Sequence, residues 1–542
     1  MKETILDLFI PDIFDIISKD LTQFDQIALS KTNHTLYDLI IPSIYRSITI
    51  DCNFSQFEKE YIGRNTTFIK SKSNFISFIK TLNKNNKLWL YINKFIVIDL
   101  PLEFYDFESF LLGTNGNANN YENNNISFFE RARLNKLNLD SPVGYIILKN
   151  LLNDKYLREN LTIINFNINK YQSIKPFKDI IKDSKYRFQN LNTLSIGPLN
   201  NEIKLNEILK LIDLNFCYKL ENLKLESVHK TCKLYDLLEF SDDIKLNSSN
   251  YIFDYLNTYK NLKSLCLNSI NIHQNLLIQN SETNKNKFKF FKNLKYLQLT
   301  DIAIISSNSN ESLLHTFYKN CDECNLQIIR LDLRSTVDDM IPKFFDEYIK
   351  PNQIKELDLV IRYNNMHDTP LVELIDKYLD LVILKHKNSL EKLSIEIKSE
   401  KNLISLEEQL QKAHLLKLIT NRFDNLKSLR LQVHFDYILL FKILLFQNFS
   451  KLENFWIVGS SAIPMHFGQG NMYPGIFDQW WRIIYLPKQL IDGVINHPLH
   501  YIKIDECLFL IDRENTEMIQ PKNQIDKIFD TMTRVSFDNI IT

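Results

Sequence analysis

The chain has few of the glycines from which phosphate-binding loops are built. Only 10 of its 542 residues are glycine, and no G-x-x-x-x-G-K-[ST], G-x-G-x-x-G or G-x-S-x-G motif occurs. The first two motifs need glycine where the backbone approaches a phosphate, and the third places a nucleophilic serine on a tight turn. These absences argue against a nucleotide-dependent enzyme or a serine hydrolase. We expect a protein that is not an enzyme in its own right.

Cysteine and histidine are also poor candidates for catalysis or metal binding. The seven cysteines are scattered, and Cys321 and Cys324 form a lone C-x-x-C without a second pair at metal-site spacing. His497 and His500 flank Leu499, which opens a copy of the repeat described below. We therefore expect no metal and no cofactor, with these residues having structural roles.

Charge and hydrophobic runs exclude two further classes of partner. The 65 lysines and arginines balance 65 acidic residues, so no global field favours nucleic acid. Residues 437–446 form the most apolar internal stretch, about half of the roughly 20 residues that a membrane span needs. Acidic residues at Asp7, Asp12 and Asp15 interrupt the early apolar run, which is untypical of a secretory signal. We expect no nucleic-acid partner, no membrane insertion, and a cytoplasmic or nuclear location or both.

The chain is rich in one repeated apolar pattern. An apolar residue is followed three and five positions later by two more, as at Leu262, Leu265 and Leu267. Other copies begin at Phe95, Leu134, Leu161, Leu191, Leu220, Leu294, Ile328, Ile354, Leu390, Leu426, Leu452, Leu499 and Met532. Two apolar residues at period two fit the buried face of a short strand. Helical patterns between copies, such as the one with Leu371 and Leu374, fit helices that cover this face.

This pattern resembles a leucine-rich repeat, in which each turn stacks a strand and a helical return on its neighbours. The resemblance implies an α/β fold with parallel strands inside and helices outside. Copies start 26 residues apart at Leu426 and Leu452 but 47 apart at Leu452 and Leu499, against roughly 20–29 in regular members. We therefore predict an irregular solenoid. A generic α/β domain with helix-connected strands is the alternative, and it leaves the repetition unexplained.

The N-terminal segment has the pattern of three short amphipathic helices within residues 11–21, 24–29 and 36–41. Pro11 suits the first turn of the first helix, where its missing N–H costs nothing. Pro42 is expected to end the third helix. Three helices of this length bury too little surface to fold alone, so they need a partner, a following domain, or both. A simple N-terminal cap for the repeats is the structural alternative.

The same residues resemble an F-box, the helical module that docks substrate receptors onto the adaptor subunit of cullin–RING ubiquitin ligases. Residues 10–12 (Ile-Pro-Asp) stand where the family has Leu-Pro-acid, and residues 44–48 (Ile-Tyr-Arg-Ser-Ile) match its exit segment. Polar residues 31–33 depart from the family's apolar second helix, which leaves contact with the cullin open. The resemblance implies that a Skp-type adaptor, and through it the cullin, is held by Ile10, Pro11, Ile13, Phe14, Ile17, Leu21, Asp25, Leu29, Leu36, Tyr37, Pro42 and Tyr45.

A segment between residues 459 and 498 interrupts the repeats with five of the ten glycines and two of the four tryptophans. Glycine and proline favour loops, and tryptophan, tyrosine and arginine are enriched at the centres of binding interfaces. The segment either packs on the solenoid or binds a partner. In the second case an unidentified protein target contacts Tyr473, Phe477, Trp480, Trp481 and Arg482. Strand positions between the buried leucines also suggest a protein ligand, because they are polar without a single sign of charge: Lys224, Cys266, Gln298, Asp332, Asp358 and Arg430.

The sequence thus predicts an F-box in residues 1–50, a solenoid in 51–458, an insertion in 459–498 and C-terminal repeats in 499–542. The resemblance implies the substrate-recognition subunit of a cullin–RING ligase of the SCF type, with the F-box on the adaptor and the repeats on the target. The alternative is an F-box protein that holds the adaptor without the ligase. Such a protein acts as a binding regulator, for example of a small GTPase in vesicle traffic or in kinetochore assembly.

Overall fold

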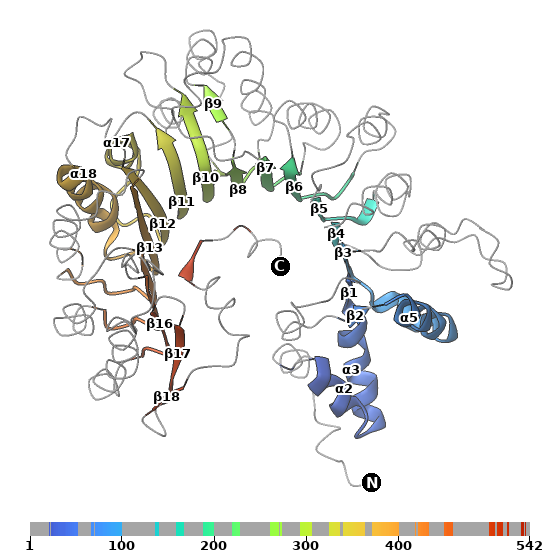
Figure 1. Cartoon of the computed structure of the whole chain (residues 1–542). Helices are drawn as coiled ribbons and strands as arrows, with labels where there is room; N and C mark the ends of the chain where they lie inside the picture. Colours follow the sequence, from blue (N-terminus) through green and yellow to red (C-terminus); the bar gives the residue numbers. More distant parts are fainter. Residues whose placement is uncertain are drawn as a thin grey trace, which may run out of the picture. The chain divides into compact units, whose positions relative to one another are not determined.

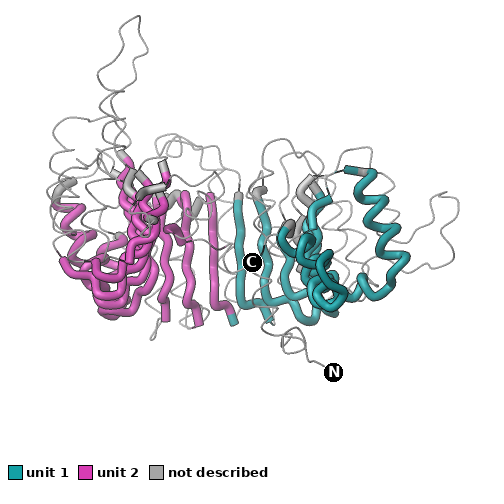
Figure 2. Tube along the Cα trace, turned by 90° about the horizontal axis from the view of Figure 1, so that it is seen from below, with its two compact units in different colours: residues 1–230, 254–261 teal, residues 231–253, 262–542 magenta. Residues whose placement is uncertain are grey.

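The computed structural model divides the chain into two compact units. Unit 1 comprises residues 1–230 and 254–261, and unit 2 comprises residues 231–253 and 262–542 (Figure 2). The structure describes residues 21, 23–51, 67–69, 71–99, 136–139, 159–166, 188–199, 219–227, 261–269, 271–273, 293–305, 325–335, 340–363, 371–399, 418, 421–432, 449–458, 498–504, 507–512, 517–519, 533–535 and 537.

Unit 1 contains a run of parallel strands. Their bounds are β1 (Ser47–Asp51), β2 (Thr67–Ile69), β3 (Lys94–Asp99), β4 (Lys136–Leu139), β5 (Ile163–Phe166), β6 (Thr193–Leu199) and β7 (Asn222–Ser227). Strand β1 pairs with both β2 and β3, and each later strand pairs in parallel with the one before it, as far as β7. Parallel pairing of consecutive strands is the arrangement that the repeated pattern predicts.

Unit 2 continues the same design with its own strands. Their bounds are β8 (Ser264–Asn268), β9 (Asn271–His273), β10 (Tyr296–Ile305), β11 (Ile328–Ser335), β12 (Glu356–Tyr363), β13 (Lys392–Ser399), β14 (Ser428–Gln432), β15 (Asn454–Val458), β16 (Tyr501–Ile504), β17 (Cys507–Asp512) and β18 (Glu517–Ile519). Strand β10 pairs with β8, β9 and β11, and parallel pairing then runs in chain order to β16. Strands β17 and β18 add to this edge in antiparallel pairs.

The predicted leucines form the core of the strands. Thirteen predicted positions are buried: Leu223, Leu225, Leu265, Leu267, Leu297, Leu299, Leu331, Leu333, Leu357, Leu359, Leu393, Leu429 and Leu431. In unit 2, helices α17 (Met340–Tyr348) and α18 (Leu371–Lys377) and the π-helix η5 (Tyr378–Ile383) lie on one side of strands β11 to β13 (Figure 1). Their buried side chains include Phe344, Phe345, Leu374 and Leu379. The α/β arrangement with parallel strands is confirmed.

Two copies of the pattern were assigned in the wrong register. Phe95 lies opposite Leu137, so the first copy is Ile92, Phe95 and Val97 rather than the one that begins at Phe95. Ile329 lies opposite Leu297 and Leu357, so that copy begins at Leu326, which is buried, and not at Ile328. In β11, Leu333 continues the period-two alternation, and in β3 residues 95–98 are all apolar, so the same spacing also matches at a shifted position.

The described residues of the last predicted copy, 533–535 and 537, do not form a strand. Met532 would have opened it, yet Val535 and Phe537 are buried against Cys266 and Tyr296, on the face of the sheet that alternates with the leucines. Val535 and Phe537 are buried as the pattern predicts, but on the opposite face of the sheet from the leucines. Apolar spacing records that side chains are buried and does not record which surface buries them.

Two described helices precede β1 in unit 1, namely α2 (Gln23–Ser30) and α3 (His34–Arg46). Pro42 lies inside α3, contrary to the prediction that it ends the helix. Its missing N–H removes one helical hydrogen bond, and packing around it offsets that loss, since Tyr45 stacks on Phe78 of α5 (Lys72–Lys84) with ring centroids 6.0 Å apart. Helix α3 ends at Arg46, and its C-cap residue Ser47 is the first residue of β1.

Candidate functional site

The first candidate surface is the pair of helices α2 and α3. The residues between them, which the sequence placed in the second helix, form the connecting turn. The hydroxyl of Thr32 donates to the carbonyl of Leu29 at 2.7 Å, and Asn33 caps α3 by accepting from the backbone N–H of Thr35 at 2.8 Å. Polar residues at 31–33 are therefore explained by a helix end and a cap.

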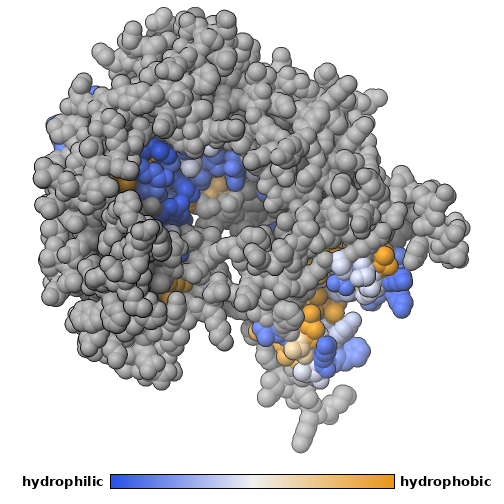
Figure 3. Space-filling view, in the orientation of Figure 1, coloured by the Kyte–Doolittle hydropathy of each residue, from blue (hydrophilic) through white to orange (hydrophobic). Residues whose placement is uncertain are grey.

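Burial in this helix pair is inverted relative to an ordinary core. Gln26, Ser30 and Ser43 are buried, whereas among the described apolar residues of α2 and α3 only Ile40 is fully buried. The buried amide of Gln26 donates to the carbonyl of Leu21 at 3.3 Å, and Ser30 donates to the carbonyl of Ile27 at 2.8 Å. The half-buried apolar residues are Leu21, Ile27, Leu29, Leu36, Leu39, Ile41 and Ile44. Figure 3 shows apolar atoms at the surface over α2 and α3.

The structure separates the predicted adaptor-binding residues into groups. Asp25 and Tyr37 are exposed, and Leu29 and Leu36 are half-buried on the same helix pair. Tyr45 packs on Phe78, and burial raises the pKa of its hydroxyl, so it belongs to the join between α3 and α5. The predicted residues Ile10, Pro11, Ile13, Phe14 and Ile17 lie outside the described residues.

The second candidate surface belongs to unit 2, and we call it the polar face. It consists of the residues of β8 to β16 that alternate with the buried leucines. The strand register aligns its central row as Cys266, Gln298, Arg330, Asp358, Ser394, Arg430, Trp456 and Lys503. Four of the six strand positions expected from the sequence lie in this row, and Asp332 lies on the same face. The sixth, Lys224, is on β7 of unit 1, where it pairs with Glu226 at 3.6 Å.

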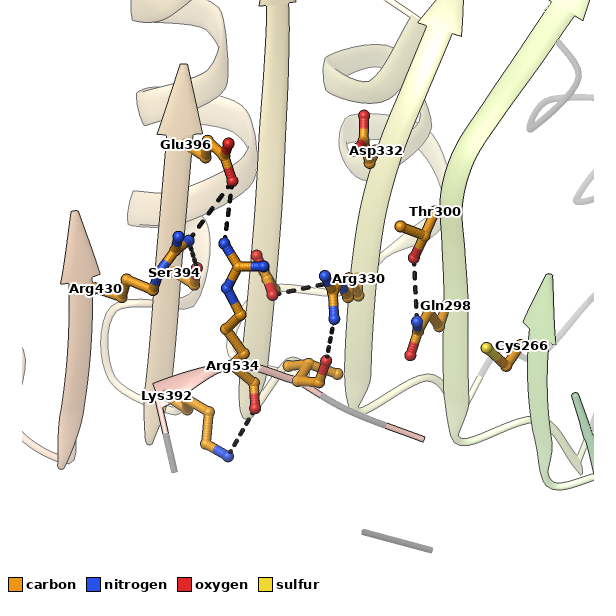
Figure 4. Close-up of polar contacts among 12 residues, drawn as sticks. Cys266, Gln298, Thr300, Arg330, Asp332, Lys392, Ser394, Glu396, Arg430 and Arg534 are labelled. Atoms are coloured by element: carbon orange, nitrogen blue, oxygen red, sulfur yellow. Dashed lines mark hydrogen bonds and ion pairs between the residues drawn. The ribbon is translucent and has the colours of Figure 1, made fainter. Parts of the chain in front are cut away.

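Opposite charges on the polar face are paired and largely buried. Arg330 Nε lies 3.5 Å from Asp358 Oδ2, and Arg430 Nη1 lies 3.7 Å from Glu396 Oε2 (Figure 4). Arg362 holds Asp332 through two hydrogen bonds of 2.6 and 3.1 Å. Removing one partner would leave a buried charge uncompensated. These pairs fix the side chains of the row in place.

Arg430 is the most deeply buried of these cations. Its side chain is 2% exposed, and its guanidinium lies 4.4 Å from the ring centroid of Trp456, whose ring also contacts the amine of Lys503 at 4.5 Å. Burial, followed by the charge of Arg534, lowers the pKa of Arg430 to about 10. The group is still protonated at neutral pH, and it also donates to Ser394 Oγ at 3.2 Å.

The C-terminal segment, which we define as residues 533–535 and 537, lies on the polar face. Arg330 Nη1 donates to the carbonyl of Val535 at 2.9 Å, and Lys392 Nζ donates to the carbonyl of Arg534 at 3.4 Å. Arg534 Nη2 lies 3.3 Å from Glu396 Oε2. The ring of Phe537 meets that of Tyr296 edge-on, with centroids 5.8 Å apart. The polar face is therefore occupied by the protein's own chain.

The sequence did not identify Arg330, Lys392, Glu396 or Arg534 as site residues. The period-two alternation contains the signal for the first three: Arg330 lies two positions from the predicted face residue Asp332, and Lys392 and Glu396 alternate in β13 with the predicted buried residues Leu393 and Ile395. No local signal marks Arg534, because its partner Glu396 is 138 positions away. The predicted target-binding residues Tyr473, Phe477, Trp480, Trp481 and Arg482 lie outside the described residues, and their role stays a prediction.

The described part of the chain offers neither a metal site nor a membrane span. Its described residues contain no group of three or more His, Cys, Asp or Glu side chains placed to hold a metal ion. No helix within the described ranges combines the length and the apolar content needed to cross a membrane.

Comparison with known proteins gives little further guidance. No family model matches the chain, and no curated protein matches it. Among solved structures, the chain is similar to one in the crystal structure of the Rad7 and Elc1 complex in yeast, with 14% sequence identity and a TM-score of 0.39. That alignment covers 88% of this chain and 100% of the other. Similarity this weak leaves the chain's function to be argued from its own residues.

Proposed function

We propose that the protein is a non-enzymatic substrate receptor of a cullin–RING ubiquitin ligase. In this proposal α2, α3 and the segment before them bind a Skp-type adaptor, and the repeats bind a target protein. The adaptor connects the receptor to the cullin, which carries the catalytic partners. The protein itself works in the cytoplasm, the nucleus or both.

The observation that carries the proposal is the inverted burial of the F-box-like helices. Their leucines and isoleucines are mostly half-buried, while Gln26, Ser30 and Ser43 occupy buried positions. A helix pair with apolar residues at its surface gains free energy when a partner covers them, at about 25 cal/mol per Å² of apolar surface. Exposed Tyr37, at 42% of its full accessibility, offers an aromatic side chain of the kind enriched at binding hot spots.

The junction between the helices and the repeats favours a positioning role. Helix α3 runs to Arg46 and β1 begins at Ser47, so no linker separates the proposed docking module from the first strand. The hydroxyl of Thr67 on β2 also donates to the carbonyl of Ile44 in α3, at 2.6 Å. A rigid junction holds a bound target at a defined place relative to the adaptor, which raises the effective concentration of its lysines near the conjugating enzyme.

Co-purification with a Skp-type adaptor and cullin tests the proposal. We expect the wild-type chain to retain both proteins and Tyr37→Ala to weaken adaptor binding about tenfold, because a covered aromatic side chain contributes roughly 1–2 kcal/mol. Ile76→Ala is the matched control, since Ile76 on α5 is also 42% exposed but lies outside the F-box-like segment.

Each other outcome has a clear reading. Loss of adaptor in the control but not in Tyr37→Ala would move the docking surface away from α3. Failure of the folded wild-type chain to bind any adaptor would refute the proposal. Retention of adaptor without cullin would exclude the ligase role and favour the regulator that the polar residues 31–33 left open.

A further inference from the structure

We infer that the polar face is a binding site for a peptide of the form Arg-Val-x-Phe, with the C-terminal segment as its built-in competing ligand. The chain carries this sequence at residues 534–537, where x is Ser536. The partner that fits the face is a protein segment with the same chemistry: one basic side chain followed by two apolar ones.

The main-chain contacts are those of a peptide receptor. Arg330 and Lys392 donate to the carbonyls of two consecutive residues, Val535 and Arg534. Because carbonyl oxygens are common to all residues, these two cations can hold a peptide backbone whatever its side chains. They come from β11 and β13, so they grip the segment from two strands of the sheet (Figure 4).

Side-chain contacts supply the selectivity. Glu396 meets the guanidinium of Arg534 at 3.3 Å, and a carboxylate at this point selects a basic residue. Buried Val535 and Phe537 pack in a cluster with Cys266 and Tyr296, against which Ile328 also packs. A hydrophobic site of this kind selects apolar side chains one and three positions after the basic residue.

The C-terminal segment fits the face incompletely. The buried Nε atom of Arg534 makes no hydrogen bond among the described residues. A buried polar atom without a hydrogen bond weakens the bound state. Its tether keeps the segment at high effective concentration, so a weak fit still fills the site until a better peptide competes. This combination is what a displaceable internal ligand requires.

The inference separates into two parts. Peptide binding to the polar face does not depend on the proposed function. Identifying that peptide with the segment by which a ubiquitination target is captured rests on it. The experiment therefore measures peptide binding with no adaptor present.

The probe is a fluorescently labelled peptide with the sequence of residues 531–538, and its binding to the full chain is measured by fluorescence polarisation. Arg534→Glu places a carboxylate against Glu396 and releases the internal ligand, while Cys266 and Tyr296, which receive the apolar side chains, are unchanged. We expect this variant to bind the probe at least about tenfold more tightly than the wild-type chain, because the open fraction of sites sets the apparent affinity.

Two further variants in the Arg534→Glu background locate the site. Arg330→Ala is expected to abolish binding, whereas Lys427→Ala should leave it unchanged, since Lys427 is an exposed lysine paired with Glu391 away from the polar face. Equal probe affinity of wild type and Arg534→Glu, or insensitivity to Arg330→Ala, overturns the inference. Should Arg534→Glu not fold, hydrogen exchange of the wild-type chain decides: excess unlabelled peptide must deprotect residues 533–537, and unchanged protection refutes displacement.

Adaptor binding and probe binding can fail separately. A chain that retains adaptor but never binds the probe leaves the receptor function standing and removes only the peptide site. A chain that binds the probe but no adaptor keeps the peptide site and removes the ligase.

Discussion

A buried histidine makes unit 2 sensitive to mild acid. His386 is 0% exposed, neither ring nitrogen has a hydrogen bond among the described residues, and its ring meets Phe345 edge-on with centroids 5.9 Å apart. Burial, and secondarily the charge of Lys385, lowers the pKa of His386 to about 4 from its usual 6.5. The folded protein therefore holds the imidazole neutral, whereas the unfolded chain takes up a proton below about pH 6.5.

The sign and size of the effect follow from this difference. Because the unfolded state binds the additional proton, stability from this group is complete above pH 6.5 and is lost as the pH falls towards 4. Between pH 7.5 and pH 5 the loss is about 2 kcal/mol, and it approaches about 3 kcal/mol near pH 4.

The assay is urea denaturation of the wild-type chain and His386→Leu at pH 7.5 and pH 5, followed by circular dichroism. Leucine removes the titrating group, and the cost of reshaping its site is the same at both pH values. We expect the wild-type free energy of unfolding to fall by about 2 kcal/mol more than that of the variant. An identical pH dependence of the two proteins would show that His386 is protonated in the folded state or reaches solvent, and would refute the reasoning.

Three further predictions concern the core, one glycine and the insertion. Leu357→Ala, at a fully buried strand position, should lower the free energy of unfolding by about 2–5 kcal/mol, whereas Leu90→Ala, at a residue 46% exposed, should change it little; equal effects in urea melts would refute the assigned strand face. Gly197→Ala should lower the free energy of unfolding of unit 1 by at least about 1–3 kcal/mol. The reason is that Gly197 has φ +147° and an added Cβ would clash with Glu226 Cβ. Unchanged thermal stability would contradict this conformation. Trp480→Ala and Trp481→Ala, tested separately, should weaken target capture in at least one variant without lowering thermal stability; if both destabilise, the insertion is structural.

The strand architecture was predictable from sequence because it depends on a local signal. Leu265 and Leu267, or Leu429 and Leu431, alternate with polar residues over a few positions, and alternation of this kind reports a strand with one buried face. The exact register of each repeat along its strand was harder to predict. At Leu326 and Ile329 the apolar alternation continues beyond the repeat, so two positions fit the pattern equally well until the neighbouring strands fix one of them.

In the candidate sites too, residues placed by local spacing were predicted and contacts between distant residues were not. Exposed Tyr37 and half-buried Leu36 lie in α3, where the helical spacing placed them. The prediction for Pro42 was wrong because it counted only the helical hydrogen bond that proline removes. The packing of α3 on α5 offsets that loss, and the residues of α5 lie too far along the chain for a local pattern to show it. Contacts of Arg534 with Glu396 join residues 138 positions apart, and no local pattern records such a pairing.

The joints between repeats make no demand on side-chain identity. At nine joints in the described part of the chain, one backbone carbonyl accepts two consecutive N–H groups from the next turn, as Lys427 does from Glu453 and Asn454, and Glu453 from His500 and Tyr501. The first of these turns is 26 residues long (427 to 453) and the second is 47 (453 to 500), yet the joint is the same. Length between joints is therefore free to drift by insertion and deletion, and a chain built in this way can acquire a new loop without changing how its turns are stacked.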